Sequence, residues 1–384
     1  MPNQLDPGGF APTDPPRRRS RGPRAPLRSG GRARGAPGPL CGSGKRVQNS
    51  RCEPHNGLKK RSVVLLVVLW AIVAWPAVAS LQQERTGPDA FPGARRSEAE
   101  LRKAAGEVRA GRVLTPKSWP NGARVAVCIS FDIDNESPML ARDLNPLPTP
   151  MSETEYGAKE GLPRILALLD REKLPASFYV PAVSAVLAPE MIPAIMKSGR
   201  HEIALHGWIH ESLPTLNNAP EEERLLNQSI EYLRKATGKR PVGNRAGGWA
   251  LSHFSIDIIK RAKLLYDSSM MSMDQPYELT ANGESTGIIE LPVSWIEDDA
   301  PYFGRTGALP SPELIFNVYR DEFDVAYREG TMLMLTFHPH VSGRRSRLVH
   351  LEKLIAHMKS KPGVWFATAE QIANYVKPQS GKTQ

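Results

Sequence analysis

The stretch Arg124–Asp134, RVAVCISFDID, decides the fold of this chain. Residues 124–130 form an apolar run of strand length, without the alternation that a half-exposed strand shows. Such a run is typical of a strand covered on both faces, as in the parallel sheet of an α/β protein. It ends in two acids, Asp132 and Asp134, separated by one residue.

Segments of helix and strand character alternate after this run, within a region that extends over residues 113–378. The alternation implies mainly parallel strands wrapped by helices. A (β/α) barrel is favoured over an open doubly wound sheet, because no glycine-rich phosphate loop follows the first strand. We therefore predict an α/β fold with a single domain over residues 113–378. Further strands are expected at 176–180, 202–205, 242–245, 264–266, 288–293, 332–337 and 364–367, and helices at 157–173, 189–198, 220–237, 252–263, 312–329 and 347–360.

The positive charge of the chain is concentrated at its N-terminus. Residues 1–61 hold 14 of the 50 Lys and Arg residues but only three of the 40 acids, so the rest of the chain is close to neutral. A near-neutral body has no field with which to attract a polyanion, which excludes a nucleic-acid-binding domain. The basic segment is rich in Pro and Gly and poor in large apolar residues, so we expect residues 1–58 to be disordered.

Residues 59–79 have the three parts of a secretory signal peptide. Lys59-Lys60-Arg61 precedes the apolar stretch Ser62–Trp75, and Ala77-Val78-Ala79 follows it. We expect export to the periplasm or the exterior, with an uncleaved membrane anchor at 62–79 as the alternative. Because a signal normally starts close to its basic part, we hypothesise a translation start near Leu58. Residues 80–112 are expected to be a linker arm, and residues 379–384 a tail.

Histidines gather at the predicted strand ends. Five of the nine lie at residues 201–210 and 338–340. If His206 and His210 lie on a helical turn, their spacing places both imidazoles on one face, which suits a transition metal. Asp132 and Asp134 point to the same side if the chain stays extended, and two such carboxylates need a cation or a shared proton. Capping acids and surface histidines are the alternatives at both places.

The motifs at these strand ends resemble those of a known family. They are Phe131–Asp134 (FDID), His206–Glu211 (HGWIHE), Asn244–Trp249 (NRAGGW), Glu290–Trp295 (ELPVSW) and Phe337–Pro339 (FHP). In order and spacing they are similar to the polysaccharide deacetylase family, the NodB homology domain of carbohydrate esterase family 4. The tracts 290–303 and 338–347 resemble a branch with the Helicobacter-type peptidoglycan deacetylase and the metal-independent allantoinase and cyclic imide hydrolases. The fold that this resemblance implies is a distorted, incomplete (β/α) barrel.

The resemblance implies hydrolysis of a non-peptide carbon–nitrogen bond, with release of acetate from an N-acetyl sugar. Asp134, His206 and His210 would bind a divalent metal, for which we expect zinc. Asp132 would act as general base and His338 as general acid, while Arg245 would keep Asp132 ionised. Trp208, Trp249 and Trp295 are candidates for stacking against a sugar ring.

The expected partner is an N-acetylglucosamine-containing polymer, with peptidoglycan as the first choice. No nucleic acid is expected, contact with a membrane is expected only through the signal or anchor segment, and homo-oligomerisation is left open. One alternative is a metal-independent cyclic amide hydrolase of the allantoinase type, and another is a non-catalytic carbohydrate-binding protein. Metal content would separate the deacetylase from the first alternative, and turnover would separate it from the second.

The signal predicts a processed N-terminus. Mass spectrometry of the exported protein should find a mature chain that begins near Ser80, because cleavage follows the Ala-x-Ala end of the signal. Recovery of peptides that span residues 60–80 from the mature protein would indicate a membrane anchor instead.

Overall fold

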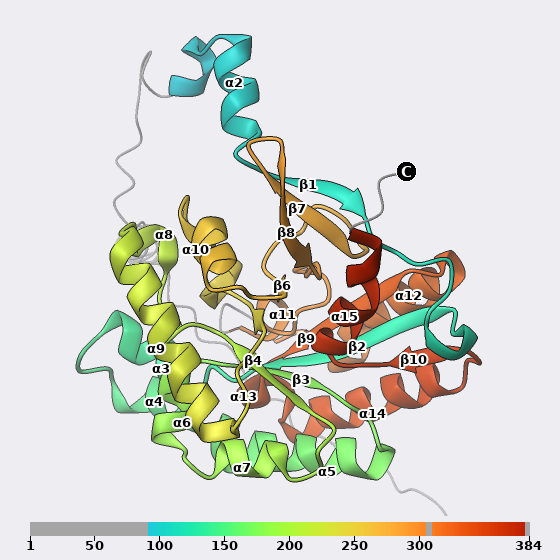
Figure 1. Cartoon of the computed structure of the whole chain (residues 1–384). Coiled ribbons are helices and arrows are strands. Elements are labelled where there is room, and N and C mark those ends of the chain that lie inside the picture. The colour runs from blue at the N-terminus through green and yellow to red at the C-terminus, as the bar shows by residue number, and fades with distance from the viewer. Residues whose placement is uncertain (1–90, 305–308, 381–384) are drawn as a thin grey trace, which may run out of the picture. The chain divides into compact units, whose positions relative to one another are not determined.

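The computed structural model describes residues 91–304 and 309–380, and Figure 1 shows how their elements are arranged. The predicted basic segment, the predicted signal or anchor at 59–79 and residues 80–90 lie outside the described residues. Within the two described ranges, no helix combines the length and the apolar character needed to cross a membrane.

The described strands form one sheet in the order β1-β7-β8-β6-β5-β4-β3-β2-β10, and β9 pairs with β2. Every pairing from β8 through β6, β5, β4, β3 and β2 to β9 and β10 is parallel. In the described chain, β8 and β9 share no ladder, and a single bridge from Asp298 to Thr336 joins these two ends of the sheet. The prediction of a distorted, incomplete (β/α) barrel is therefore confirmed. The strands are β1 (Val108–Val113), β2 (Val125–Asp132), β3 (Ser177–Val180), β4 (Glu202–Leu205), β5 (Gly243–Asn244), β6 (Tyr266–Asp267), β7 (Tyr277–Ala281), β8 (Glu284–Glu290), β9 (Met332–Phe337) and β10 (Val364–Phe366).

Helices follow the parallel strands and cover the sheet. Each of the six predicted helices lies within a few residues of its predicted bounds, and α12 has the bounds that the sequence predicts, whereas other helices, such as those at Pro148–Tyr156 and Ala369–Ser380, were not predicted. The predicted helix 157–173 begins with one turn of π-helix, η4, before it continues as α5. The helices are η2 (Pro92–Arg95), α2 (Glu98–Ala105), η3 (Pro120–Gly122), α3 (Ser137–Arg142), α4 (Pro148–Tyr156), η4 (Gly157–Gly161), α5 (Leu162–Glu172), α6 (Ala182–Leu187), α7 (Met191–Met196), α8 (Leu213–Leu216), α9 (Ala219–Thr237), η5 (Gly247–Trp249), α10 (Ser255–Arg261), α11 (Ala300–Phe303), α12 (Pro312–Glu329), α13 (Pro339–Ser342), α14 (Arg345–Lys359) and α15 (Ala369–Ser380).

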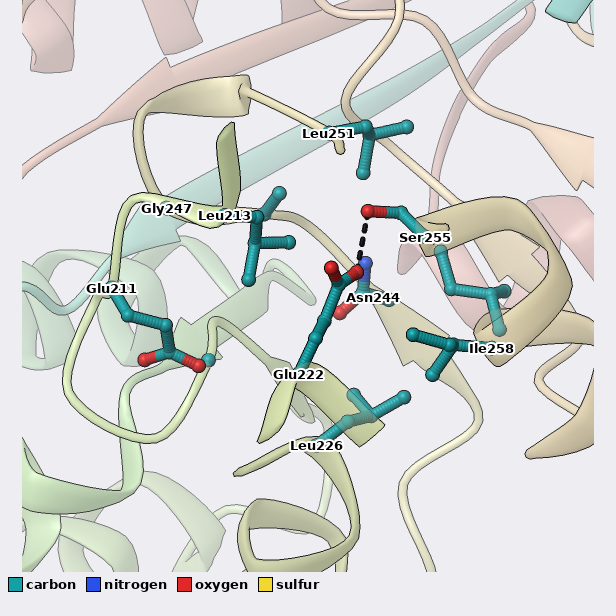
Figure 2. A pocket seen from close by; sticks show the side chains of 12 residues that line it. Glu211, Leu213, Glu222, Leu226, Asn244, Gly247, Leu251, Ser255 and Ile258 are labelled. Atoms are coloured by element: carbon teal, nitrogen blue, oxygen red, sulfur yellow. Dashed lines mark hydrogen bonds between the residues drawn. The ribbon is translucent and has the colours of Figure 1, made fainter. Parts of the chain in front are cut away.

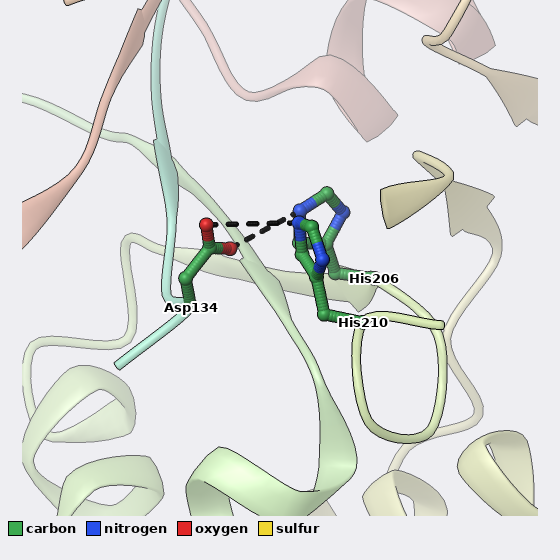
Figure 3. Close-up of side chains that lie close together, drawn as sticks. All are labelled: Asp134, His206 and His210. Carbon is green, nitrogen blue, oxygen red and sulfur yellow. Dashed lines mark ion pairs between the residues drawn. The ribbon is translucent and has the colours of Figure 1, made fainter. Parts of the chain in front are cut away.

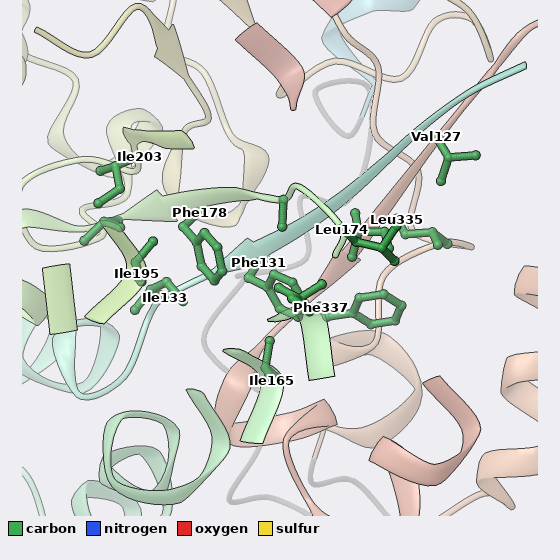
Figure 4. Close-up of a cluster of buried hydrophobic side chains, with 14 of the residues drawn as sticks. Val127, Phe131, Ile133, Ile165, Leu174, Phe178, Ile195, Ile203, Leu335 and Phe337 are labelled. Atoms are coloured by element: carbon green, nitrogen blue, oxygen red, sulfur yellow. The ribbon is translucent and has the colours of Figure 1, made fainter. Parts of the chain in front are cut away.

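Both faces of strand β2 are buried, as its apolar sequence predicts. Its odd-numbered residues join the core between the sheet and the helices, where the ring of Phe131 lies 5.2 Å from that of Phe178 and 6.0 Å from that of Phe337 (Figure 4). Its even-numbered residues face the other way, and Cys128 joins a second buried cluster there. Burial raises the pKa of the Cys128 thiol to about 12, in keeping with its predicted packing role. Asp132 has the same parity as Cys128, so the inner face of the sheet leads into the polar site.

Two antiparallel strands, β1 and β7, extend the sheet beyond the barrel and were not predicted. All but the last residue of strand β1 belongs to the segment 80–112, which was expected to be a linker arm, so that expectation is wrong for this part of the segment. A two-residue turn, Asn282-Gly283, with φ of 52° and 86°, joins β7 to β8. This Asn-Gly pair is the sequence signal that could have revealed the hairpin.

The close contact between η4 and α13 predicts a strict need for glycine at residue 161. A Cβ on Gly161 would lie 2.1 Å from the backbone carbonyl oxygen of Pro339, so Gly161→Ala requires the backbone next to His338 to move. We expect the variant to lose about 1–3 kcal/mol of unfolding free energy in urea titrations. Gly93→Ala is the control, because a Cβ on Gly93 meets nothing within 4 Å. Equal stability of the two variants would contradict this account.

Candidate active site

The polar residues selected from the sequence lie at the carboxyl ends of four parallel strands. Asp132 ends β2 and Asp134 follows it, while His206, Arg245 and His338 follow β4, β5 and β9. These strand ends meet at one edge of the barrel, the edge at which enzymes of this architecture carry their catalytic groups. The fold thus brings together residues that are more than two hundred positions apart in the sequence.

Asp134, His206 and His210 form a compact group of donors of the kind that bind metals (Figure 3). Nε2 of His206 lies 3.3 Å from Oδ1 of Asp134, and Nε2 of His210 lies 3.6 Å from Oδ2. Oδ1 of Asp134 is buried and accepts no hydrogen bond from any residue in the described part of the chain. Nδ1 of His206 lies 2.8 Å from the carbonyl oxygen of Arg245, and a proton donated there leaves Nε2 free to bind a cation.

The charge states of this group also suit a metal. Burial works against ionisation of Asp134, but the charge of His210 and the contacts with His206 hold the pKa of Asp134 well below its usual value. Burial lowers the pKa of His210. Burial also opposes protonation of His206, but the charge of Asp132 and the contacts with Asp134 raise its pKa, so a cation bound there would displace a proton. One carboxylate and two imidazoles are the donor set of a zinc site with an open position, so these residues fit a divalent ion.

The expected helical turn at His206 and His210 is wrong, because the two histidines lie in a loop. Gly207 and His210 have φ of 79° and 60°, in the left-handed region that a right-handed helix does not contain. The carboxylate of Glu211 accepts the backbone N–H groups of Trp208 (3.1 Å) and Ile209 (2.8 Å) and so satisfies the amides of the loop. Figure 2 shows Glu211 in this loop, where it lines a small pocket with Leu213 and Leu226.

A buried ion pair fixes Asp132. Nη1 of Arg245 donates to Oδ1 of Asp132 at 2.6 Å, and Nε1 of Trp249 donates to Oδ2 at 3.3 Å. Arg245 is fully buried, so this is not a surface salt bridge, and its guanidinium lies 3.8 Å from the ring centroid of Tyr179. Burial alone would raise the pKa of Asp132, but the charges of Arg245 and His206 lower it below the ordinary value. Asp132 is therefore held ionised.

A second pair fixes His338, and its acidic partners were not assigned from the sequence. Nδ1 of His338 donates to Asp299 at 2.7 Å, and the backbone N–H of His338 donates to the same carboxylate. Asp298 lies 3.5 Å from Nδ1. Burial opposes protonation of His338, but these two acids hold its pKa well above the usual value. The available signal was the pair of adjacent acids, Asp298 and Asp299, within the tract 290–303.

Asp298, Asp299 and His338 also form a group of possible metal donors. The hydrogen bond to Asp299 occupies the ring nitrogen that a metal would need there. We therefore interpret these residues as an acid–base group. Burial raises the pKa of Asp298 to about 7, and the charge of His338 opposes this rise.

The three tryptophans have different surroundings. Trp249 is buried beside Asp132, and Trp295 stacks on it with ring centroids 4.2 Å apart. Trp295 is 47% exposed, so a large part of its surface remains accessible to a ligand. Trp208 packs edge-on against Tyr232 of α9. The structure thus brings Trp249 and Trp295 to the candidate base, whereas Trp208 lies against a helix.

Comparisons with known proteins agree with this geometry. A family model described as polysaccharide deacetylase matches residues 153–266. The peptidoglycan deacetylase of Helicobacter pylori is 30% identical over 257 residues, which cover 59% of this chain and 87% of that protein.

Two crystal structures extend the likeness to the fold. One, from Mycobacterium smegmatis and also described as a polysaccharide deacetylase, is 36% identical, with a TM-score of 0.65, over 72% of this chain and 98% of that one. The Puue allantoinase is 25% identical, with a TM-score of 0.63, over 71% of this chain and 96% of that one.

The His338–Asp299 pair predicts a pH-dependent contribution to stability. Since the folded-state pKa of His338 lies above its unfolded value, the contribution is complete below the unfolded pKa and is lost as pH rises through the folded one. Asp299→Asn should move the imidazole titration of His338 to lower pH and reduce this contribution. Proton NMR and urea titrations of metal-free protein across the neutral and alkaline range would measure both effects.

Asp324→Asn provides a matched control for this measurement. It removes the carboxylate that lies 2.8 Å from the half-exposed His357 and should leave His338 unaffected. An unchanged titration of His338 in Asp299→Asn would refute the assigned pairing.

Proposed function

Because this chain belongs to the polysaccharide deacetylase family, we propose that it removes N-acetyl groups from an N-acetylglucosamine-containing polysaccharide in a metal-dependent reaction. Its enzyme class is that of hydrolases acting on carbon–nitrogen bonds other than peptide bonds. The observation that carries the proposal is the meeting of a metal-type donor set with an ionised Asp132 and a protonated His338. Peptidoglycan is the polymer we propose, supported by the likeness to the Helicobacter enzyme.

Asp134, His206 and His210 would hold the divalent ion, and zinc suits their donor atoms. When bound, such an ion polarises the amide carbonyl and lowers the pKa of water.

We propose that Asp132 takes the proton of the attacking water. Its Oδ2 lies 3.6 Å from Nε2 of His206, next to the donor set, while Oδ1 is bound by Arg245. The guanidinium keeps the carboxylate ionised and fixes its orientation, so Oδ2 is the oxygen turned toward the reacting atoms. A base held in this geometry assists attack on an otherwise unreactive amide.

We propose that His338 protonates the leaving amine. Its Nε2 lies 3.6 Å from Oδ2 of Asp134, so the acid approaches the donor set from β9, whereas the base approaches it from β2. Asp299 binds the other ring nitrogen and stabilises the imidazolium. The amine leaves only after it gains a proton, and His338 carries that proton at neutral pH.

A cyclic amide hydrolase is the second candidate, since the allantoinase structure has a similar fold at 25% identity. It requires the same carbon–nitrogen bond cleavage but a small ring as substrate. For location, we propose export by the segment 59–79, which would bring the enzyme to cell-wall polymers.

The central test is release of acetate from purified N-acetylglucosamine polymers, peptidoglycan included. We expect release that a chelator stops and zinc restores, whereas allantoin and cyclic imides should remain intact. Hydrolysis of the small rings without acetate release from any polymer would favour the second candidate. Binding of polymers without turnover of any substrate would indicate a non-catalytic protein.

Variants of the two site aspartates should separate their roles. Asp132→Asn should retain the metal but lose about 10² to 10⁴ in kcat, because the amide cannot accept the proton of water. Asp134→Asn, His206→Ala and His210→Ala should instead lose the metal, measured by elemental analysis of the purified protein. Asp143→Asn, at an exposed acid that accepts the N–H of Asn145, is the control. Loss of metal in Asp132→Asn with retention in Asp134→Asn would exchange the two roles.

A further inference from the structure

Two more carboxyl groups, those of Asp267 and Glu290, lie behind the Arg245–Asp132 pair. We propose that Asp267 and Glu290 share one proton and that the resulting hydrogen bond positions Arg245. This role rests on the proposed function, in which Arg245 serves the general base. Asp267 ends β6 and Glu290 ends β8, and both side chains are fully buried.

The sheet places the two acids side by side. Asp267 and Glu290 are register partners in the parallel pair β6–β8, so their side chains leave neighbouring strands at the same level. Neither acid forms an ion pair with any Lys, Arg or His within residues 91–304 and 309–380. Two adjacent buried carboxylates without a cation repel each other strongly, so one of them must be protonated.

The hydrogen bonds of the two carboxyl groups indicate which oxygen carries the proton. Asp267 accepts from the side-chain amide of Asn244 at 2.7 Å and from the N–H of Ser269 at 2.9 Å, which uses both of its oxygens. Oε1 of Glu290 accepts the N–H of Met270 at 2.9 Å. Oε2 of Glu290 is buried and has no donor among the described residues. A proton on Oε2 makes this oxygen a donor to Asp267, so that every oxygen of the two carboxyl groups then takes part in a hydrogen bond.

The electrostatic surroundings agree with a single shared proton. Burial, and next the charge of Asp267, raise the pKa of Glu290 well above its ordinary value. Tyr277 of β7, the partner of Glu290 on its other side, has a raised pKa and stays neutral. From β5 the pair faces the neutral amide of Asn244. No neighbouring strand supplies a cation that could replace the proton.

The residues that follow each acid, Ser268 after Asp267 and Leu291 after Glu290, connect the two acids to Arg245. The carbonyl and hydroxyl oxygens of Ser268 accept from Nε and Nη2 of Arg245 at 3.1 and 3.0 Å. The same hydroxyl donates to the carbonyl of Leu291 at 2.7 Å, and Ser269 accepts the N–H of Ala246 at 2.9 Å. The shared proton holds the ends of β6 and β8 together, and these ends orient the guanidinium toward Asp132. Asp267 and Glu290 are therefore positioning residues, since neither touches the donor set.

Infrared spectroscopy tests the proton itself, independently of any activity. Metal-loaded wild-type protein in D2O at neutral pH should show the carbonyl stretch of a protonated carboxylic acid that Glu290→Gln lacks. Glu202→Gln is the control, because Glu202 is another buried acid, bound to Ser177 and Tyr266, and its variant should keep the band lost in Glu290→Gln. If wild type and Glu290→Gln have identical spectra in this region, the shared proton is refuted.

Kinetics test the link to Arg245. The side chain of Glu290→Leu cannot form a hydrogen bond to Asp267, so we expect Arg245 to be held less firmly and its ion pair with Asp132 to weaken. The pKa of Asp132 should then rise, and the acid limb of the kcat/KM profile should move to higher pH by about one unit or more. Glu290→Gln should keep the limb in place, because its amide donates to Asp267 and accepts from Met270.

The melting temperature and the pH profile of the variants distinguish a positioning role from a purely structural one. A lower melting temperature in Glu290→Leu with an unmoved acid limb would reduce the pair to a structural role and overturn the positioning claim. If Glu290→Leu does not fold, a shift of the acid limb in Glu290→Gln would overturn it as well. Absence of deacetylation by the wild type would reject the proposed function alone, since the infrared result still decides whether the proton is shared.

Discussion

The buried ion pair between Arg245 and Asp132 is the contact on which the rest of the site depends. It joins the ends of β2 and β5, and the backbone carbonyl of Arg245 also accepts a hydrogen bond from Nδ1 of His206, which follows β4. A buried pair of this kind is costly to break from one side, at about 3–5 kcal/mol, because the remaining charge has no partner. One arginine thus fixes the candidate base with its side chain and a metal-type ligand with its backbone.

The parallel sheet explains why these groups meet. Each strand of the barrel delivers its polar residue at the same edge, and the apolar residues before it anchor that residue in the core. In β2, Phe131 packs under the helices, whereas the next residue, Asp132, points to the opposite face of the sheet. Neighbouring residues of one strand therefore serve the core and the site. The gap between β8 and β9 lies on the side from which Asp298 and Asp299 reach His338.

The sequence predicted the barrel and the residues that the site brings together, because apolar runs and terminal polar groups are local features. It missed what depends on contacts between distant segments. Asp299 could be seen only as an acid after β8, and its pairing with His338 follows from the bridge between Asp298 and Thr336. The wrong helical turn at His206 has the same origin, since spacing suggested a helix but Gly207 and the carboxylate of Glu211 stabilise a loop.

The charges of the site also explain which carboxylate suits a metal. Asp132 is balanced by Arg245, Asp299 by His338, and Glu290 by a proton in the arrangement we propose. Asp134 differs, because it is surrounded by the imidazoles of His206, His210 and His338, and Nδ1 of His206 is turned to the carbonyl of Arg245. Its Oδ1 is buried and accepts no hydrogen bond within the described residues, and a divalent cation bound there would take the place of a proton on its histidine neighbours. Asp132, Asp299 and Glu290 already have a partner that compensates their charge and need no metal ion. Asp132 therefore remains available as a base, whereas Asp134 is the carboxylate suited to bind a metal.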